Sequence, residues 1–159
     1  MKDVSSSRRQ IIKAGSALGA MSIMGFPAIV KAQADKIRIG HLTPLTGFLG
    51  PLGEYGTMGI KQAVDEVNKA GGVLGRQLEL ITEDSVNPAT AASKAQRMYE
   101  RDGVMCLLGE INSAAGLAIS QVAARNQKIF INTGGNSDEL RGKSCNKFMF
   151  HLELSLIHI

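Results

Sequence analysis

Polar groups that can bind a small anion are concentrated in the segment 109–115, GEINSAA. An apolar run typical of a buried strand precedes this segment, and a helix-period pattern follows it. A helix N-terminus offers free N–H groups and the positive end of the helix dipole. We therefore predict that the Ser113 hydroxyl binds a carboxylate, with the amides of Ala114 and Ala115 donating beside it. The alternative is an ordinary N-cap, in which Ser113 or Asn112 satisfies only its own helix, and position alone leaves both open.

The segment 131–137, INTGGNS, repeats this arrangement one strand further along the chain. Its two glycines allow a ligand to approach bare backbone, and Asn136 offers both a donor and an acceptor. Gly134 and Asn136 therefore join Ser113 and Ala114 as candidate ligand-binding residues. The alternative is a tight strand-to-helix turn with the asparagine in a left-handed conformation.

The sequence gives little support for nucleotide binding or for nucleophilic catalysis. Glycines recur every third residue from Gly47 to Gly59, but the spacing is neither the dinucleotide-binding pattern nor a phosphate-binding P-loop, so we expect a glycine-permitted loop entering a helix. Asp84 closes an expected strand and is the type of acid that holds a ribose, which keeps a dinucleotide-binding protein as an alternative. Ser113 lacks the G-x-S-x-G surroundings of a nucleophile, and we expect no enzymatic activity.

No metal or cofactor site is expected. The three histidines do not form a site, because they fall in separate parts of the chain. Cys106 and Cys145 have no second cysteine or histidine at metal-ligand spacing. A disulfide between them is possible but not indicated, since Cys106 lies in an apolar run where a buried thiol is the commoner role.

The elements that position these residues alternate between strands and helices after residue 35. This order predicts an α/β fold with a doubly wound parallel sheet, in which ligands bind at the carboxyl ends of the strands. A glycine-rich connection over 43–53 is expected to lead into the first helix. The expected strands are 36–42, 77–83, 104–109, 128–132 and 147–152. The first expected helix ends at Gly71-Gly72, the second and third span 88–102 and 113–126, and a fourth begins near Ser137.

The net charge of +4 is confined to the first 34 residues, where five bases face one acid. From Asp35 onward 13 bases face 13 acids, as the totals of 18 and 14 require, and this balance gives no support for a nucleic-acid partner. Arg8 and Arg9 precede an uncharged stretch, 14–30, and resemble a twin-arginine (Tat) export signal. The sequence AQA at 32–34 offers a cleavage site, so we expect residues 1–34 to be removed and the product to be soluble in the periplasm. The alternative is a membrane anchor, for which this stretch is short and weakly apolar.

The mature sequence resembles the N-terminal lobe of the branched-chain amino-acid-binding (Leu/Ile/Val-binding) family of periplasmic receptors for ABC importers. The resemblance covers nearly all of 36–152. It rests on IRIG at 37–40, PLTG at 44–47, YG at 55–56, Gly59, AVDEVN at 63–68, GGVLGR at 71–76, ED at 83–84, NP at 87–88, Gly109, Ser113 and EL at 139–140.

The resemblance implies two Rossmann-like lobes that close on a hinge over a small ligand. It implies that Ser113 binds the ligand carboxylate, that Gly134 offers backbone atoms, and that Tyr55 lies where the family often has a cleft tyrosine. Asn136 stands in the place of a threonine, and Glu110 is a bulky acid beside the site; related receptors take amides, urea or aromatic acids. The expected ligand is therefore an amino acid, an amide or a small carboxylate.

The expected partners are ABC permease subunits in the inner membrane, together with the Tat machinery through Arg8 and Arg9. Residues 35–153 are expected to be one lobe of a longer receptor, of type I periplasmic binding protein fold. Residues 154–159 fit neither the family nor a capped ending and are expected to be a non-native tail. Two alternatives remain open: a Tat-exported dinucleotide-binding oxidoreductase, and a sensory ligand-binding domain of the same fold.

Overall fold

The computed structural model describes residues 35–152. The predictions for 1–34, including Arg8 and Arg9, and for 154–159 lie outside the described residues. Strands and helices alternate along the described part, as expected. In chain order they are β1 (Ile37–Thr43), α2 (Gly50–Lys69), β2 (Leu78–Asp84), α3 (Pro88–Glu100), β3 (Cys106–Gly109), α4 (Ser113–Asn126), β4 (Ile129–Asn132), α5 (Asp138–Arg141) and β5 (Met149–His151).

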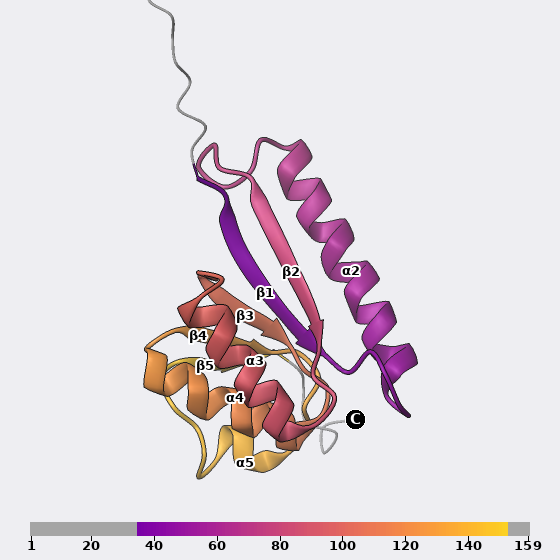
Figure 1. The fold of residues 1–159 in the computed structure, drawn as a ribbon, viewed down its shortest axis with the longest axis vertical. Coiled ribbons are helices and arrows are strands. Elements are labelled where there is room, and N and C mark those ends of the chain that lie inside the picture. Colours follow the sequence, from indigo (N-terminus) through magenta and orange to yellow (C-terminus); the bar gives the residue numbers. More distant parts are fainter. Residues whose placement is uncertain (1–34, 153–159) are drawn as a thin grey trace, which may run out of the picture. The chain divides into compact units, whose positions relative to one another are not determined.

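The strands form one parallel sheet in the order β2-β1-β3-β4-β5 (Figure 1). The order reverses between β1 and β3, because the chain runs outward from β1 to β2 and then returns to the other side of β1. This is the topological switch point of a doubly wound sheet, where ligands bind beyond the carboxyl ends of the strands. The predicted fold class is confirmed.

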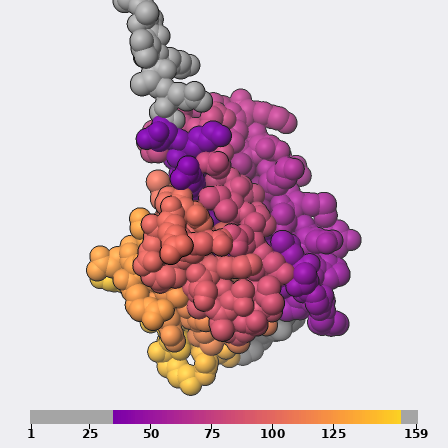
Figure 2. Space-filling model, in the orientation of Figure 1, coloured from indigo at the N-terminus to yellow at the C-terminus, as the bar shows by residue number. Residues whose placement is uncertain are grey.

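The two faces of the sheet are covered by different helices. Leu78 and Leu80 of β2 line a hollow together with Val64 of α2, so these alternate residues face α2. On the opposite face, a side chain added at Gly40 would meet Met98 of α3 at 3.1 Å. Helices α3 and α4 pack against each other on this second face, and α3 occupies the centre of the view in Figure 2.

The hydrophobic core lies between the sheet and the pair α3–α4. Its largest members, each fully buried, are Leu42, Met98, Leu107, Ile119, Phe130 and Leu140. Because these residues come from β1, α3, β3, α4, β4 and α5, burying them fixes the strand ends relative to one another.

The face that α2 covers over β1 and β2 continues over β3, β4 and β5 without a helix of the described residues packed on it. The strand register places five side chains on this part of the face. Ile129 and Phe150 are 43% and 52% exposed. The five residues are Cys106, Leu108, Ile129, Ile131 and Phe150.

Local signals place most helix ends as predicted. Asn87 caps α3 by accepting from the Thr90 N–H at 2.9 Å, with Pro88 in the first turn. The start of α2 differs from the prediction, because the helix begins at Gly50 and the predicted connection continued to residue 53. A side chain at Gly53 would lie 1.7 Å from the Pro44 carbonyl oxygen, so glycine here permits close packing of the helix on the preceding loop. The third strand begins at Cys106, two residues later than predicted.

Candidate functional site

The turn between β3 and α4 shows which residue caps the helix. Asn112 is the N-cap, and its side-chain oxygen accepts from the Ala115 N–H at 3.1 Å. Ser113 is the first helical residue and does not cap its own helix. The prediction that the Ala115 amide faces a ligand is wrong, because Asn112 already uses that donor.

The Ser113 hydroxyl is oriented by the neighbouring loop. Its oxygen accepts from the Ser137 N–H at 3.1 Å, which leaves the hydroxyl proton to be donated elsewhere. The N–H groups of Ser113 and Ala114 lie in the first helical turn, where no carbonyl of the helix can accept from them. Ser113 is half-buried and Ala114 is exposed. Up to three donors, one hydroxyl and two amides, thus converge on the N-terminus of α4, which suits a carboxylate.

Gly134 lies directly against this turn. A side chain at position 134 would come within 2.5 Å of Ile111 Cγ2, and the Gly134 N–H donates to the Glu110 carbonyl at 3.1 Å. The amide of Gly134 therefore holds the two loops together, and its carbonyl is the group left for a ligand. The segments predicted to form the site, 109–115 and 131–137, are thus in contact.

Asn136 contributes an acceptor with no partner. Its side-chain oxygen is buried and receives no hydrogen bond within the described residues. The residue is not in the left-handed region, so the turn conformation considered from the sequence as an alternative does not occur. A buried amide oxygen of this kind suits a ligand that carries N–H donors.

Tyr55 lies in α2 and is 70% exposed. It takes no part in the hydrogen bonds that join the β3–α4 and β4–α5 loops within the described residues. Its role as a cleft residue stays a prediction.

Asp84 organises the loop that follows β1. Its carboxylate accepts from the Leu45 N–H at 2.9 Å, the Thr46 hydroxyl at 2.6 Å and the Val86 N–H at 3.0 Å. Burial alone raises the pKa of Asp84, but these hydrogen bonds outweigh burial and hold the pKa below its ordinary value. A carboxylate occupied in this way is not free to hold a ribose. A hollow of about 320 Å³ lies beside it, lined by residues of the β1–α2 and β2–α3 loops and the start of α4.

Glu110, which the sequence places beside the site, was not among the predicted ligand-binding residues. Its side chain is fully buried at the end of β3, and burial raises the pKa of its carboxyl. The sequence did contain a signal, since an acid directly follows a buried apolar strand and precedes the anion-binding turn.

Of the histidines in the described part of the chain, His41 lies on β1 and His151 on β5, and these strands are not adjacent. Burial lowers the pKa of His41 from 6.5 to about 4, so its imidazole is neutral at pH 7. Cys106 is half-buried and Cys145 is exposed, and both thiols are free.

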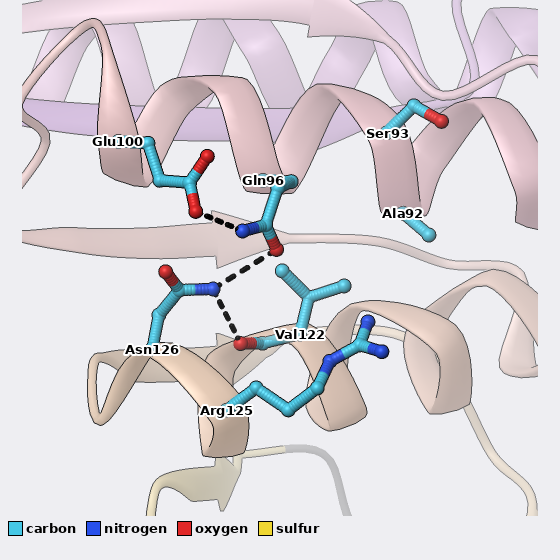
Figure 3. Close-up of a pocket in the computed structure, with 7 residues that line it drawn as sticks. All are labelled: Ala92, Ser93, Gln96, Glu100, Val122, Arg125 and Asn126. Carbon is cyan, nitrogen blue, oxygen red and sulfur yellow. Dashed lines mark hydrogen bonds between the residues drawn. The ribbon is translucent and has the colours of Figure 1, made fainter.

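A larger hollow of about 530 Å³ lies between α3 and α4 and is lined only by residues of these two helices (Figure 3). The Gln96 amide donates to Glu100, and the Asn126 amide donates to Gln96 at 3.0 Å and to the Val122 carbonyl at 2.9 Å. The Gln96 and Asn126 amides satisfy each other and Glu100, so they form a polar seam between the two helices. Among residues 35–152, no helix is both long enough and apolar enough to cross a bilayer.

An open parallel sheet with anion-binding donors beyond its strand ends is the architecture of a ligand-binding lobe of the type I periplasmic binding proteins. The chain belongs to the periplasmic binding protein family, whose model matches residues 36–155. A Leu/Ile/Val-binding protein homolog of Brucella suis is 37% identical over 130 residues, which are 81% of this chain and 31% of that protein.

Two crystal structures show the same fold. The substrate-binding protein LivJ of a branched-chain amino acid transporter from Streptococcus pneumoniae, in complex with isoleucine, is 27% identical with a TM-score of 0.71; the match covers 76% of this chain and 34% of LivJ. A periplasmic binding protein from Burkholderia mallei is 35% identical with a TM-score of 0.68, over 73% of this chain and 31% of that one. The chain thus spans between 31% and 34% of the length of these relatives, which are named as binding or transporter substrate-binding proteins.

Proposed function

We propose that the full-length protein is the solute-binding receptor of an ABC importer and captures a small amino acid, or a related carboxylate or amide, in the periplasm. The observation that carries this proposal is the Ser113 hydroxyl, whose oxygen already accepts from Ser137 and whose proton is free to donate. The relatives named for branched-chain amino acids support this ligand class. The buried oxygen of Asn136 would accept from an amino or amide group of the same ligand.

The proposed mechanism is hinge closure. The lobe described here supplies donors from one side of a ligand, and a second lobe would supply the opposite wall. Ligand binding then favours the closed state, because only that state contacts the ligand from both sides. Permease subunits in the inner membrane would recognise the closed receptor.

The proposed route to the periplasm is Tat export through Arg8 and Arg9, with cleavage after Ala34. Of the alternatives, the dinucleotide-binding oxidoreductase is not favoured, because Asp84 is engaged by the backbone and hydroxyl of the β1–α2 loop. A sensory domain of the same fold would share the ligand site and differ in the sequence that follows it.

Calorimetric titration of the full-length gene product with leucine, isoleucine, valine, amides and small carboxylates tests the proposal. A charge-assisted hydrogen bond contributes about 1.5–3 kcal/mol, so Ser113→Ala is expected to weaken binding by roughly 10- to 150-fold. Ser93→Ala is the matched control, since Ser93 is exposed on α3 and its hydroxyl donates to Ala89 of its own helix at 3.1 Å. Absence of binding across the whole panel, or equal affinity of the Ser113 and Ser93 variants, would refute the proposal.

A further inference from the structure

Glu110 makes hydrogen bonds to three residues at the edge of the sheet where the strands have their carboxyl ends. Its N–H donates to the Leu42 carbonyl at the end of β1, at 2.7 Å. Its carbonyl accepts from the Gly134 N–H at 3.1 Å and from the Asn132 side-chain amide at 3.4 Å, both beyond or at the end of β4. A single residue therefore joins β1, β3 and the β4–α5 loop through its backbone.

The Glu110 side chain folds back onto its own turn. One carboxyl oxygen accepts from the Ile111 N–H at 3.1 Å and from the Asn112 N–H at 2.8 Å. The second oxygen is buried and has no hydrogen-bond partner among the described residues. Asn112 in turn caps α4, so the carboxyl supports the residue that starts the helix carrying Ser113.

The backbone of Glu110 is held in a costly conformation. Its φ of +69° lies in the left-handed region, which a residue with a side chain seldom adopts and which costs on the order of 1 kcal/mol or more. Such a conformation persists only when the surroundings enforce it, and the bonds to Leu42, Ile111, Asn112 and Gly134 are those surroundings.

We propose that Glu110 is a positioning residue that fixes the β3–α4 turn and the β4–α5 loop at ligand-binding spacing before a ligand arrives. This inference rests on the proposed function, because the spacing it fixes is that of Ser113, Gly134 and Asn136. Pre-ordering these loops removes an entropic cost from ligand binding. Glu110 would therefore raise the affinity for a ligand by holding Ser113 in place, and not by contacting the ligand itself.

The electrostatic surroundings of Glu110 agree with a support role. Burial raises the pKa of its carboxyl most strongly; the hydrogen bonds from the Asn112 and Ile111 N–H groups lower it, and the nearby charge of Asp84 raises it. His41 on the neighbouring strand is buried and neutral at pH 7, and Lys94 is directed to the Asp84 carbonyl at 2.7 Å. Glutamine keeps an acceptor oxygen and has the neutral charge that burial favours, so it is the conservative variant.

Two measurements on Glu110→Ala, Glu110→Gln and the control Glu79→Ala test the proposal. Glu79 pairs with Arg38 on the sheet surface at the opposite end of the strands, and its side chain is 38% exposed. The first measurement is amide hydrogen exchange by NMR on the 159-residue chain without ligand. Exchange at Ile111 and Asn112 is expected to accelerate at least about 10-fold in Glu110→Ala and to stay within about threefold of wild type in Glu110→Gln and Glu79→Ala. This arm does not depend on the identity of any ligand.

The second measurement is amino-acid affinity of the full-length protein. Glu110→Ala is expected to weaken binding about 10-fold or more, with Glu110→Gln and Glu79→Ala within about threefold of wild type. Wild-type exchange rates at Ile111 and Asn112 in Glu110→Ala would overturn the inference, and so would equal losses of affinity in the Ala and Gln variants. Failure of the wild type to bind any amino acid, with the exchange result as expected, would refute the proposed function and leave the role of Glu110 in the turn supported. If Glu110→Ala does not fold, the exchange rates of the Ile111 and Asn112 amides in Glu110→Gln test the proposal. Accelerated exchange in that variant would contradict the role of the Glu110 side chain as an acceptor.

Discussion

Replacing Gly53 with alanine should destabilise the protein, although alanine is the better helix former. Gly53 lies in the first turn of α2 and packs against the loop after β1. A Cβ at this position would be 1.7 Å from the Pro44 carbonyl oxygen and 2.8 Å from its carbonyl carbon. Backbone atoms cannot rotate away, so the helix and the loop must separate by at least about 1.3 Å to bring the closest contact to 3.0 Å.

The magnitude follows from two opposing effects. Alanine in place of glycine inside a helix stabilises by about 1 kcal/mol. Overpacking costs about 1–3 kcal/mol, and a clash with a backbone carbonyl belongs at the upper end of this range. The free energy of unfolding is therefore expected to fall by about 2 kcal/mol.

Gly56→Ala in the same helix is the matched control, because a Cβ there meets no atom within 4 Å. This variant should be more stable than wild type by about 1 kcal/mol. The assay is urea unfolding followed by circular dichroism, since the chain has no tryptophan to report by fluorescence. The two variants should differ in stability by about 3 kcal/mol and therefore in midpoint by roughly 1–3 M urea. Equal stabilisation by both substitutions would refute the close packing of α2 on Pro44.

Three further predictions concern the cap, the buried histidine and the thiols. Asn112→Ala should lower the free energy of unfolding by about 1 kcal/mol and Asn112→Asp by much less, because only the latter keeps an acceptor for the Ala115 N–H; equal losses in urea unfolding would contradict the cap. The pKa of His41 is about 4 in the folded protein and 6.5 in the unfolded chain. Between these pH values only the unfolded chain binds the proton, so the free energy of unfolding should fall as the pH drops, by up to about 3 kcal/mol. Urea unfolding between pH 7 and pH 4 measures this, and a His41→Gln variant with an unchanged pH dependence would disprove it. Cys145 should react with a thiol reagent faster than Cys106, because Cys145 is exposed whereas burial raises the pKa of the Cys106 thiol. Comparison with Cys145→Ser assigns the two rates, and a fast reaction that survives this substitution would contradict the slow reaction expected of the half-buried Cys106.

The sheet and its order of elements were predictable from the sequence because each strand and helix carries its own local pattern. The apolar run ending at Gly109 and the pair Asn87-Pro88 are signals of this kind, and both lie where predicted. The start of α2 was not predictable in this way. Glycines at 50 and 53 favour a loop by intrinsic propensity, and only the approach of the loop after β1 explains why they lie in a helix.

The candidate site was likewise predictable only in part. Its position at the strand ends follows from the alternating pattern, and the segments 109–115 and 131–137 do meet. The choice between Ser113 and Asn112 as helix cap depends on where the Ser137 N–H lies, which is a contact between residues 24 positions apart. The network around Glu110 likewise depends on β1 and β4 being its neighbours in space, and no local pattern contains that information.

The turn that carries Ser113 is proposed to bind the carboxylate of a small amino-acid-type ligand. The most direct test is the affinity of the full-length protein for the amino acid that it binds best, compared with the amide of the same amino acid. Replacing the carboxylate by a neutral amide removes charge-assisted hydrogen bonds, so the amide is expected to bind at least about 10-fold more weakly. The same affinity for acid and amide would contradict it.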